Sequence, residues 1–405
     1  MTKHEELLKL YYKKQNITEE LEKRLANPCT YKTELEIFPI SKEKRVMDQK
    51  FNLFYLPIGD ILLLEEKIYR QSAEIQRLSI NLPMIARVSC IREIMVNEII
   101  KTNGIEGVRT TKKDVYESMD SKKKTRLSGI INKYNQIIEN NIERIDSPEE
   151  IKDLYEYIFS QDILENPENR LDGKLFRKGR IHISNGLKTV HIGDTSEEMI
   201  ISHITDLVKF MNKSDIQSLV KASIAHYYLE YIHPFYDGNG RFGRLLFSMY
   251  LARKTDVFTA LSLSYAIFSD KDGYSKLFLD VSNPRNCGEV TFFVKGMLEF
   301  ILKGQESIIE MLNQNIVKLE FAFQYIKDCG LTEIESEILS IYVQDYIFAE
   351  RSNMKDSEIL EYLPIKSKLT LKKHLDSLVD KNYLQQISKR PSQHSLSEFL
   401  KGEFE

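Results

Sequence analysis

The sequence predicts a mainly α-helical protein, because apolar residues recur at helical spacing along most of its length. Leu219, Ile224, Tyr228 and Ile232 illustrate this spacing, and the charged residues between such positions are typical of solvated helix faces. Only 17 glycines and 10 prolines are spread over 405 residues, without an evident repeat or low-complexity segment, so connections between helices should be short. A chain of this length predicts two or three folding units.

The charge balance and the cysteines exclude several classes of protein. The 57 Lys and Arg residues against 60 Asp and Glu give a net charge of −3, which argues against a globally cationic nucleic-acid-binding protein but allows a local basic patch. The cysteines form no Cys-x-x-Cys pair, so we expect buried free thiols and neither a zinc site nor a disulfide framework. The N-terminus lacks the apolar core of a secretory signal, and no apolar run approaches a membrane span. We therefore expect a cytoplasmic protein that does not act at membranes.

One segment, Arg180–Ile192, departs from the helical pattern. Its residues alternate between apolar and polar around Asn185-Gly186, a dipeptide typical of tight hairpin turns. The segment therefore predicts a β-hairpin in an otherwise helical region. Since an isolated hairpin is unstable unless it packs on other elements, it is either a structural flap or one that grips a substrate.

The C-terminal block has the order of elements found in a winged helix. Helical patterns at Thr332–Glu350, Asp356–Tyr362 and Leu369–Lys381 precede a short β-like tail at Tyr383–Ser388. Basic residues give the third helix a positive face that suits DNA phosphates: Lys366, Lys368, Lys372, Lys373 and His374. Acidic residues nearby make a solvated face on a protein-interaction module an equally good interpretation.

The segment His233–Arg244, with the sequence HPFYDGNGRFGR, concentrates residues suited to phosphate chemistry. It lies between an amphipathic helical pattern and an apolar run, which predicts a helix, a loop and a second helix. Gly238, Asn239 and Gly240 can turn tightly and direct backbone N–H groups at one point, and the second helix adds the positive end of its dipole. The loop is therefore a predicted anion-binding site.

Four side chains of the same segment supply the other groups that a nucleotide site needs. Arg241 and Arg244 are three positions apart on the second helix, so both guanidinium groups can bind polyphosphate from one face. Asp237 offers a carboxylate to a Mg²⁺ that bridges phosphates, because hard cations prefer oxygen ligands. His233 can accept a proton from an attacking hydroxyl near neutral pH and is the predicted general base. Each residue alone is commonplace, but their combination in one segment favours a functional site.

This segment resembles the Fic family signature HxFx(D/E)GNGRxxR at every defined position. Phe235 occupies the position whose ring anchors the loop to the core in that family. The resemblance implies a helical Fic core, and it places the hairpin Arg180–Ile192 where the family carries a flap that binds the target protein. The spacing of the glycines and the first arginine matches members that transfer nucleotides, unlike the altered spacing of Doc-like kinases.

The resemblance implies a role for each matched residue. His233 would deprotonate a Ser, Thr or Tyr hydroxyl of the target, which would attack the α-phosphate of ATP and release pyrophosphate. Asp237 would hold Mg²⁺. The remaining residues would bind the nucleotide: Gly238, Asn239 and Gly240 at the anion hole, Arg241 and Arg244 at the β- and γ-phosphates, and Tyr274 near the adenine, where Gly273 replaces the first residue of the family's aromatic pair.

A second segment, Thr102–Gly107, resembles the family's inhibitory helix pattern (S/T)xxxE(G/N). The family counterpart of Glu106 pairs with the second arginine of the signature, here Arg244, and prevents productive binding of the γ-phosphate. The resemblance therefore implies that Glu106 inhibits the chain's own activity. Gly107 can serve as a helix C-cap at the same time.

The expected organisation has three parts: an N-terminal helical region with the inhibitory helix at 1–112, a Fic catalytic domain with a hairpin flap at 113–310, and a winged-helix-like domain at 311–405. The expected activity is protein adenylylation with ATP and Mg²⁺, inhibited by Glu106. Two other interpretations stay open: a deAMPylase or a transferase with another donor on the same scaffold, and a DNA-binding regulator that works through the C-terminal domain. Expected partners are a protein with a hydroxyl side chain, including the chain itself, DNA through the C-terminal domain, and a second copy of the chain in a homodimer.

Overall fold

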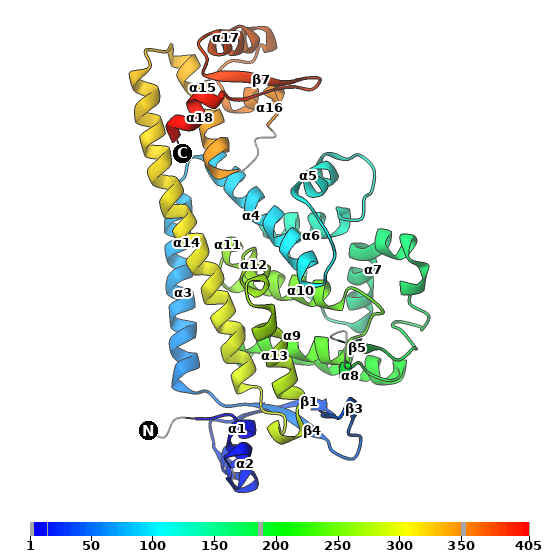
Figure 1. The fold of residues 1–405 in the computed structure, drawn as a ribbon. Helices are drawn as coiled ribbons and strands as arrows, with labels where there is room; N and C mark the ends of the chain where they lie inside the picture. Colours follow the sequence, from blue (N-terminus) through cyan, green and yellow to red (C-terminus); the bar gives the residue numbers. More distant parts are fainter. Residues whose placement is uncertain (1–3, 14, 185–188, 350–353, 405) are drawn as a thin grey trace. The chain divides into compact units, whose positions relative to one another are not determined.

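The structure is a computed structural model that describes residues 4–13, 15–184, 189–349 and 354–404. Within these residues it is mainly helical, as the sequence predicts, and its strands form four small two-stranded antiparallel sheets (Figure 1). No helix of the described part is both long enough and apolar enough to cross a membrane.

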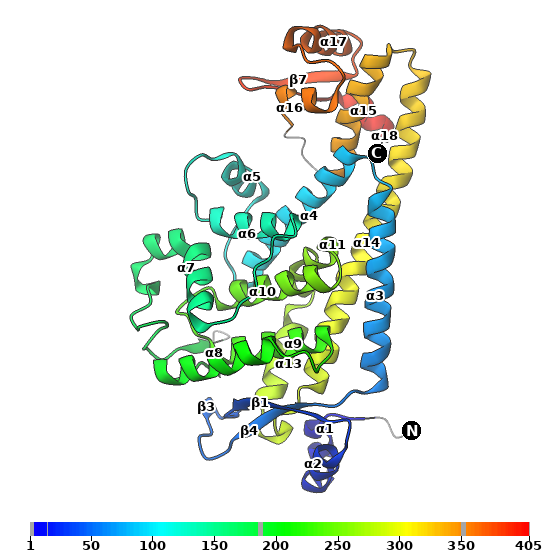
Figure 2. The ribbon, with the colours of Figure 1, turned by 180° about the vertical axis from the view of Figure 1, so that it is seen from behind.

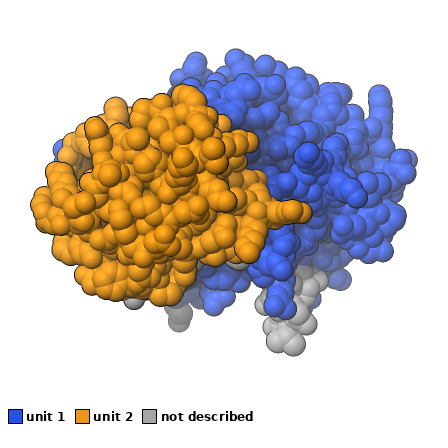
Figure 3. All heavy atoms as spheres, turned by 90° about the horizontal axis from the view of Figure 1, so that it is seen from above, with its two compact units in different colours: residues 1–72, 96–305 blue, residues 73–95, 306–405 orange. Residues whose placement is uncertain are grey.

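The chain divides into two compact units, which Figure 3 shows in different colours. The first unit comprises residues 1–72 and 96–305, and the second comprises residues 73–95 and 306–405. Three long helices contribute residues to both units: α3 (Gly59–Ile80), α4 (Met84–Ile105) and α14 (Thr291–Asp328).

The first unit is built around helices whose buried faces follow the apolar spacing in the sequence. Leu219, Ile224, Tyr228 and Ile232 of α9 are all buried, and α9 packs between α8 and α10, as both Figure 1 and Figure 2 show. The other elements of this unit are α1 (Leu7–Tyr12), α2 (Ile17–Ala26), β1 (Tyr31–Ile37), β2 (Ile40–Ser41), β3 (Lys44–Arg45), β4 (Phe51–Tyr55), α5 (Lys112–Asp120), α6 (Ser128–Ile138), α7 (Pro148–Glu165), η1 (Pro167–Asn169), β5 (His182–Ser184), β6 (Thr189–Ile192), α8 (Glu197–Met211), α9 (Ser218–Ile232), α10 (Asn239–Lys254), α11 (Val257–Ala260), α12 (Leu263–Phe268), α13 (Lys271–Ser282) and η2 (Pro284–Asn286).

The N-terminal region contains strands in addition to the helices that the sequence predicts. Strands β1 and β4 pair antiparallel, with Tyr31 opposite Tyr55. Thr33, Leu35 and Ile37 of β1 are buried while the residues between them are not, which is the alternation expected of a strand with one covered face. This alternation is short and lies between helical patterns, and the sequence analysis therefore predicts helices but no strands in this region.

Helix α7 begins where its sequence provides a strong start signal. The Ser147 hydroxyl accepts the N–H of Glu150 at 3.2 Å, and Pro148 occupies the first turn, where no N–H is needed. Glu149 and Glu150 complement the positive end of the helix dipole. The start of α7 is thereby fixed, which matters because one face of this helix contacts the candidate site.

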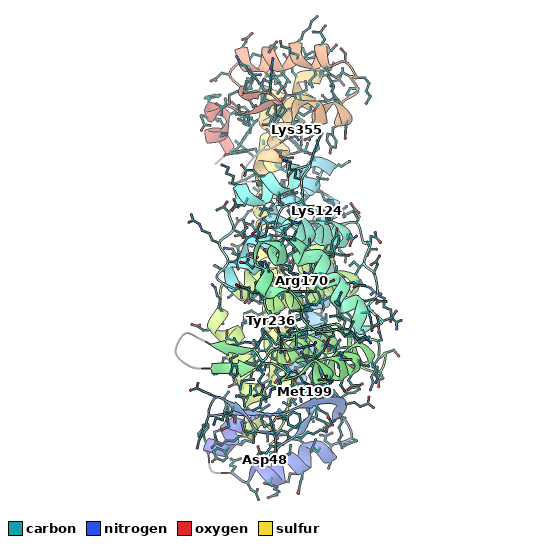
Figure 4. All side chains as sticks on the ribbon, turned by 90° about the vertical axis from the view of Figure 1, so that its right-hand side faces the viewer. Asp48, Lys124, Arg170, Met199, Tyr236 and Lys355 are labelled. Atoms are coloured by element: carbon teal, nitrogen blue, oxygen red, sulfur yellow. The ribbon has the colours of Figure 1, made fainter. Side chains whose placement is uncertain are left out.

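The predicted hairpin is present. Strands β5 and β6 pair antiparallel, with His182 opposite Ile192 and Ile183 opposite His191, although the predicted Asn185-Gly186 turn lies outside the described residues. Tyr236 of the signature segment is labelled beside this hairpin in Figure 4, and its hydroxyl accepts the N–H of Gly179 at 3.0 Å.

The C-terminal part of the second unit consists of helical elements, a β-hairpin and a final helix. The order expected from the sequence is present, and the β-like tail is the first strand of a hairpin whose second strand, like the final helix, the sequence analysis did not anticipate. The basic residues Lys366, Lys368, Lys372 and Lys373 are exposed; the winged-helix assignment and DNA binding stay predictions. The elements are α15 (Glu333–Phe348), α16 (Asp356–Ile359), η3 (Leu360–Tyr362), α17 (Lys368–Asp380), β7 (Leu384–Lys389), β8 (Ser392–Leu396) and α18 (Glu398–Phe404).

Candidate active site

The loop between α9 and α10 is shaped by two residues in the left-handed backbone conformation. His233 ends α9 with φ 53°, and Gly238 precedes α10 with φ 80°. A side chain at Gly238 would also crowd the ring of Phe159, so glycine suits both the conformation and the available space. Because α10 starts at Asn239, the unpaired N–H groups of its first turn lie at the end of this loop, where an anion can accept them.

Asn239 holds the loop closed with its side chain. Its Oδ1 accepts the N–H of Phe235 at 3.0 Å, and its Nδ2 donates to the carbonyl of Phe235 at 2.8 Å. The residue is 2% exposed. Both polar atoms of the side chain are therefore used to hold the loop in shape. The backbone N–H is the group of Asn239 that can bind an anion.

Phe235 fixes the loop against α7. Its ring is fully buried and stacks on Tyr155 with the ring centroids 3.6 Å apart. The Tyr155 hydroxyl donates to the carbonyl oxygen of Asp237 at 3.0 Å. Helix α7 thus contacts the loop through both an aromatic stack and a backbone hydrogen bond.

His233 is held as a neutral imidazole with one free nitrogen. Its Nδ1 lies 3.2 Å from the carbonyl oxygen of Glu230, and because a carbonyl can only accept, Nδ1 carries the proton and Nε2 has the lone pair. Burial is the main cause that lowers the pKa of His233 to about 4; the Glu230 carbonyl, Glu106 and Asp237 oppose this, and the Arg177 charge adds to it. Nε2 has no hydrogen-bond partner among the described residues, so it is available to accept a proton.

Arg244 joins the signature helix to the segment that resembles the inhibitory helix. Its Nη2 lies 2.7 Å from Glu106 Oε1 and also donates to the carbonyl of Thr102 at 2.9 Å. Its Nε donates to the Thr102 hydroxyl at 2.9 Å. The guanidinium is almost fully buried, whereas 37% of the Glu106 side chain is exposed. A side chain at Gly240 would collide with the Glu106 carboxylate, which therefore lies directly against the anion loop.

The charge of Glu106 is favoured by its neighbours. Burial is the largest single influence and raises its pKa, but the positive charge of Arg244, its hydrogen bond, and the charge of Arg241 together lower the pKa below its ordinary value. The carboxylate is therefore ionised at neutral pH and presents a negative charge beside Gly240 at the start of α10.

Arg241 is engaged by two carboxylates. Its Nη2 donates to Asp237 Oδ2 and its Nη1 donates to Asp162 Oδ2, both at 3.0 Å. The Arg241 side chain is 6% exposed, and Asp237 is 54% exposed. Asp237 thus faces solvent on the loop, while the guanidinium that was expected to bind phosphate is already paired.

A cavity of about 560 Å³ collects most of the predicted residues, a volume in the range of small-molecule sites. Its lining includes Glu106, His233, Gly240, Arg244 and Tyr274. Asp237 and Arg241 are outside this lining, on the side of the loop that contacts α7. The Tyr274 hydroxyl lies 2.7 Å from Nε2 of His226, which fixes the ring at the wall.

Glu230 is a cavity residue that the sequence analysis did not select. Burial, followed by the charge of Glu106, raises its pKa to about 8, so it is mostly protonated at neutral pH. Its Oε1 is buried without a hydrogen-bond partner in the described part of the chain, and its Oε2 lies 3.8 Å from Nδ1 of His233. A charged residue inside the apolar segment Ala225–Ile232 was the available signal.

Comparison with known proteins finds similarity over the part of the chain that contains this loop. Residues 145–251 match the Fic/DOC family. Protein adenylyltransferase fic-1 of Caenorhabditis elegans is 39% identical over 61 residues, and fic-1 of Caenorhabditis briggsae is 37% identical over 59 residues. Each match covers 14% of this chain and only 12% of the relative, so the similarity concerns a small part of either protein.

Similarity of fold extends further than similarity of sequence. A crystal structure of a Fic family protein from Desulfovibrio desulfuricans superposes with a TM-score of 0.52 and 17% identity, covering 85% of this chain and 98% of that one. At this identity the match bears on the fold alone. Together with the match of residues 145–251 to the Fic/DOC family, it shows that the chain has a mainly helical Fic fold.

Proposed function

We propose that this chain is a protein adenylyltransferase that moves AMP from ATP to a hydroxyl group of a protein and is inhibited by its own Glu106. The observation that carries the proposal is the convergence, on one cavity, of a neutral histidine with a free Nε2, a helix N-terminus behind Gly238, and the buried Arg244. These are a base, an anion site and a phosphate-binding cation within reach of one nucleotide.

The proposed nucleotide pose follows from the chemistry of the lining. Phosphates accept the N–H groups at the start of α10 and the guanidinium of Arg244. The base and ribose occupy the part of the cavity lined by Tyr274, Phe278 and Leu279. Apolar and aromatic walls with few polar groups are typical of such subsites.

In the proposed reaction, the target hydroxyl oxygen bonds to the α-phosphorus as the bond from that phosphorus to the bridging oxygen of pyrophosphate breaks. The hydroxyl proton moves to Nε2 of His233, whose Nδ1–H stays on the Glu230 carbonyl. The N–H groups of the anion loop stabilise the charge that develops on the phosphoryl oxygens.

The residues present also fit Mg²⁺ bound together with nucleotide. No cluster of three or more His, Cys, Asp or Glu side chains suited to a metal exists among the described residues, so the protein alone offers no metal cage. Asp237 offers an exposed carboxylate beside the anion loop, and its Oδ1 has no hydrogen-bond partner in the described part. One carboxylate plus phosphate oxygens is a common way to hold Mg²⁺, which would neutralise phosphate charge there.

The test of the proposed function is incubation of the purified chain with ATP and Mg²⁺, followed by its intact mass. A gain of one AMP, absent when Mg²⁺ or ATP is omitted, supports adenylyl transfer to the chain itself. A gain of a phosphate, or of another group from a different donor, would assign a different transferase.

A deAMPylase is the second candidate, and one observation favours it. Glu106 is partly exposed in the same cavity as His233, where its ionised carboxylate can orient a water molecule as well as exclude a phosphate. Loss of AMP from a chain modified beforehand, faster in wild type than in Glu106→Gly, would identify this activity.

The pH dependence of transfer should reflect the depressed pKa of His233. Since protonation of His233 occurs near pH 4, the base form dominates above that value, and the Glu106→Gly variant should keep nearly constant kcat/KM between about pH 5.5 and 7.5. Removing Glu106 lowers the pKa of His233 further, since Glu106 raises it. A fall in activity centred near 6.5, in protein shown to be folded by circular dichroism, would contradict the assigned state of His233.

A further inference from the structure

One face of α7 supports the signature loop at three points. Tyr155 contacts Phe235 and Asp237, as described above, and the ring of Phe159 lies 4.7 Å from the guanidinium carbon of Arg241. Asp162 completes the set with its hydrogen bond to Arg241. These three residues of α7 are spaced four and three positions apart, so they share one face of the helix.

Arg241 is a bridge between this face and Asp237. It donates one nitrogen to each of two carboxylates, of which Asp162 is 12% exposed and Asp237 is 54% exposed. Asp162 and Arg241 are 79 residues apart in the sequence. A second cation, Arg126, lies farther from Asp162, with its Nε 3.9 Å from Oδ1 and its side chain 34% exposed.

We propose that Asp162 is a positioning residue that, through Arg241, holds the Asp237 carboxylate ready to bind Mg²⁺. The inference rests on the proposed function, because it takes Asp237 to be the residue that holds Mg²⁺ with the nucleotide. It adds a residue from α7, outside the signature, and it gives Arg241 a role in orienting the metal ligand.

The physical reason is the division of one positive charge between two negative ones. When Asp162 is ionised, its negative charge balances the positive charge of Arg241, so the Asp237 carboxylate can still attract a cation. At the same time, the hydrogen bond from Arg241 holds one of the two Asp237 oxygens in place. Without the charge of Asp162, Asp237 is the one charged carboxylate left within hydrogen-bond distance of Arg241 among the described residues. The arginine then competes with Mg²⁺ for the same carboxylate.

The experiment compares Asp162→Asn with wild type by titrating Mg²⁺ into protein and ATP and measuring nucleotide binding calorimetrically. Asn keeps the size of the side chain and can still accept from Arg241, but it removes the charge. We expect the Mg²⁺ concentration for half-maximal effect to rise about tenfold, at the low end of the 10–100-fold effects seen when partners of metal ligands are changed. ATP affinity without Mg²⁺ should be unchanged or higher, since a negative charge near the site has been removed.

Two further variants separate positioning from folding. Asp153→Asn makes the same chemical change on α7 at a side chain that is 74% exposed, and it should leave the Mg²⁺ midpoint unchanged. Asp162→Glu retains the charge and should restore most of the Mg²⁺ response. If Asp162→Asn lowers the melting temperature but its folded protein has the wild-type Mg²⁺ midpoint, Asp162 is structural only and the inference is wrong.

The proposed function can fail separately. If wild-type protein binds ATP equally with and without Mg²⁺, or does not bind ATP, the assignment of Asp237 and the proposed function are contradicted before Asp162 is considered. If wild type shows a Mg²⁺ response and Asp162→Asn shows the same one, only the positioning role is overturned.

Discussion

Replacing Glu106 with glycine should raise AMP transfer about tenfold above the wild-type rate. The substitution removes the carboxylate that pairs with Arg244 at 2.7 Å and lies against Gly240, and so it clears the place of a phosphate. Because 37% of the Glu106 side chain is exposed, solvent screens the pair. A net contribution of about 1–2 kcal/mol then corresponds to roughly a fivefold to thirtyfold change. The measurement is auto-modification at saturating ATP and Mg²⁺, followed by intact mass over time.

Matched variants identify the cause of that increase. Glu106→Gln keeps the shape but not the charge and should give an intermediate rate. The double variant Glu106→Gly/His233→Ala should lose the increase, since the base is still required. None of these substitutions changes Arg244 or Thr102, so we expect their two hydrogen bonds to keep the end of α4 against α10 in every variant. A Glu106→Gly protein that binds ATP but transfers no faster than wild type would show that Glu106 is not inhibitory.

Removing the imidazole of His233 should lower the rate of AMP transfer by at least about a hundredfold in the Glu106→Gly background. Nε2 is the acceptor available to the attacking hydroxyl, and nothing else in the proposed mechanism replaces it. ATP affinity should change little, because His233 acts on the hydroxyl and the phosphates are bound by Arg244 and the loop. The measurements are transfer rate, ATP affinity and melting temperature for each variant.

Two substitutions are needed because of the backbone at this position. His233 has φ 53°, a conformation in which alanine is strained and asparagine is well tolerated. His233→Asn therefore serves as the control for strain, since it removes the base but keeps the loop. Transfer at the wild-type rate by folded His233→Asn protein would refute the assigned mechanism. A loss of transfer in His233→Ala alone would indicate strain in the loop.

The parts of the site that lie close together in sequence were predictable from it. His233, Gly240 and Arg244 belong to one short segment, in which a helix, a tight glycine turn and a second helix follow one another, and the structure places all three at one cavity. The pairing of Arg244 with Glu106 was also predicted, from the resemblance of a second segment, and the structure shows it at 2.7 Å. The strands of the hairpin at Arg180–Ile192 followed from alternation and its turn residues.

The environment of those residues was decided by tertiary structure alone. Asp162 contacts Arg241, 79 residues away in the sequence, and Tyr155 stacks on Phe235. Local periodicity in the sequence does not encode such pairs. Burial of Glu230 raises its pKa and burial of His233 lowers it, because loss of water disfavours the charged form of each.

The grouping of the chain into units was likewise beyond the sequence. Residues 73–95 join the C-terminal segment in the second unit, where the Ser89 hydroxyl donates to Asp345 at 2.7 Å. The spacing of apolar residues predicts which face of a helix is buried. It does not predict which distant helix packs against that face, since many helices in the chain carry a similar apolar face. The sequence therefore determined the signature segment and the kinds of side chain that it carries, while the folded chain determined which charges surround it, because those charges come from residues that only packing brings together.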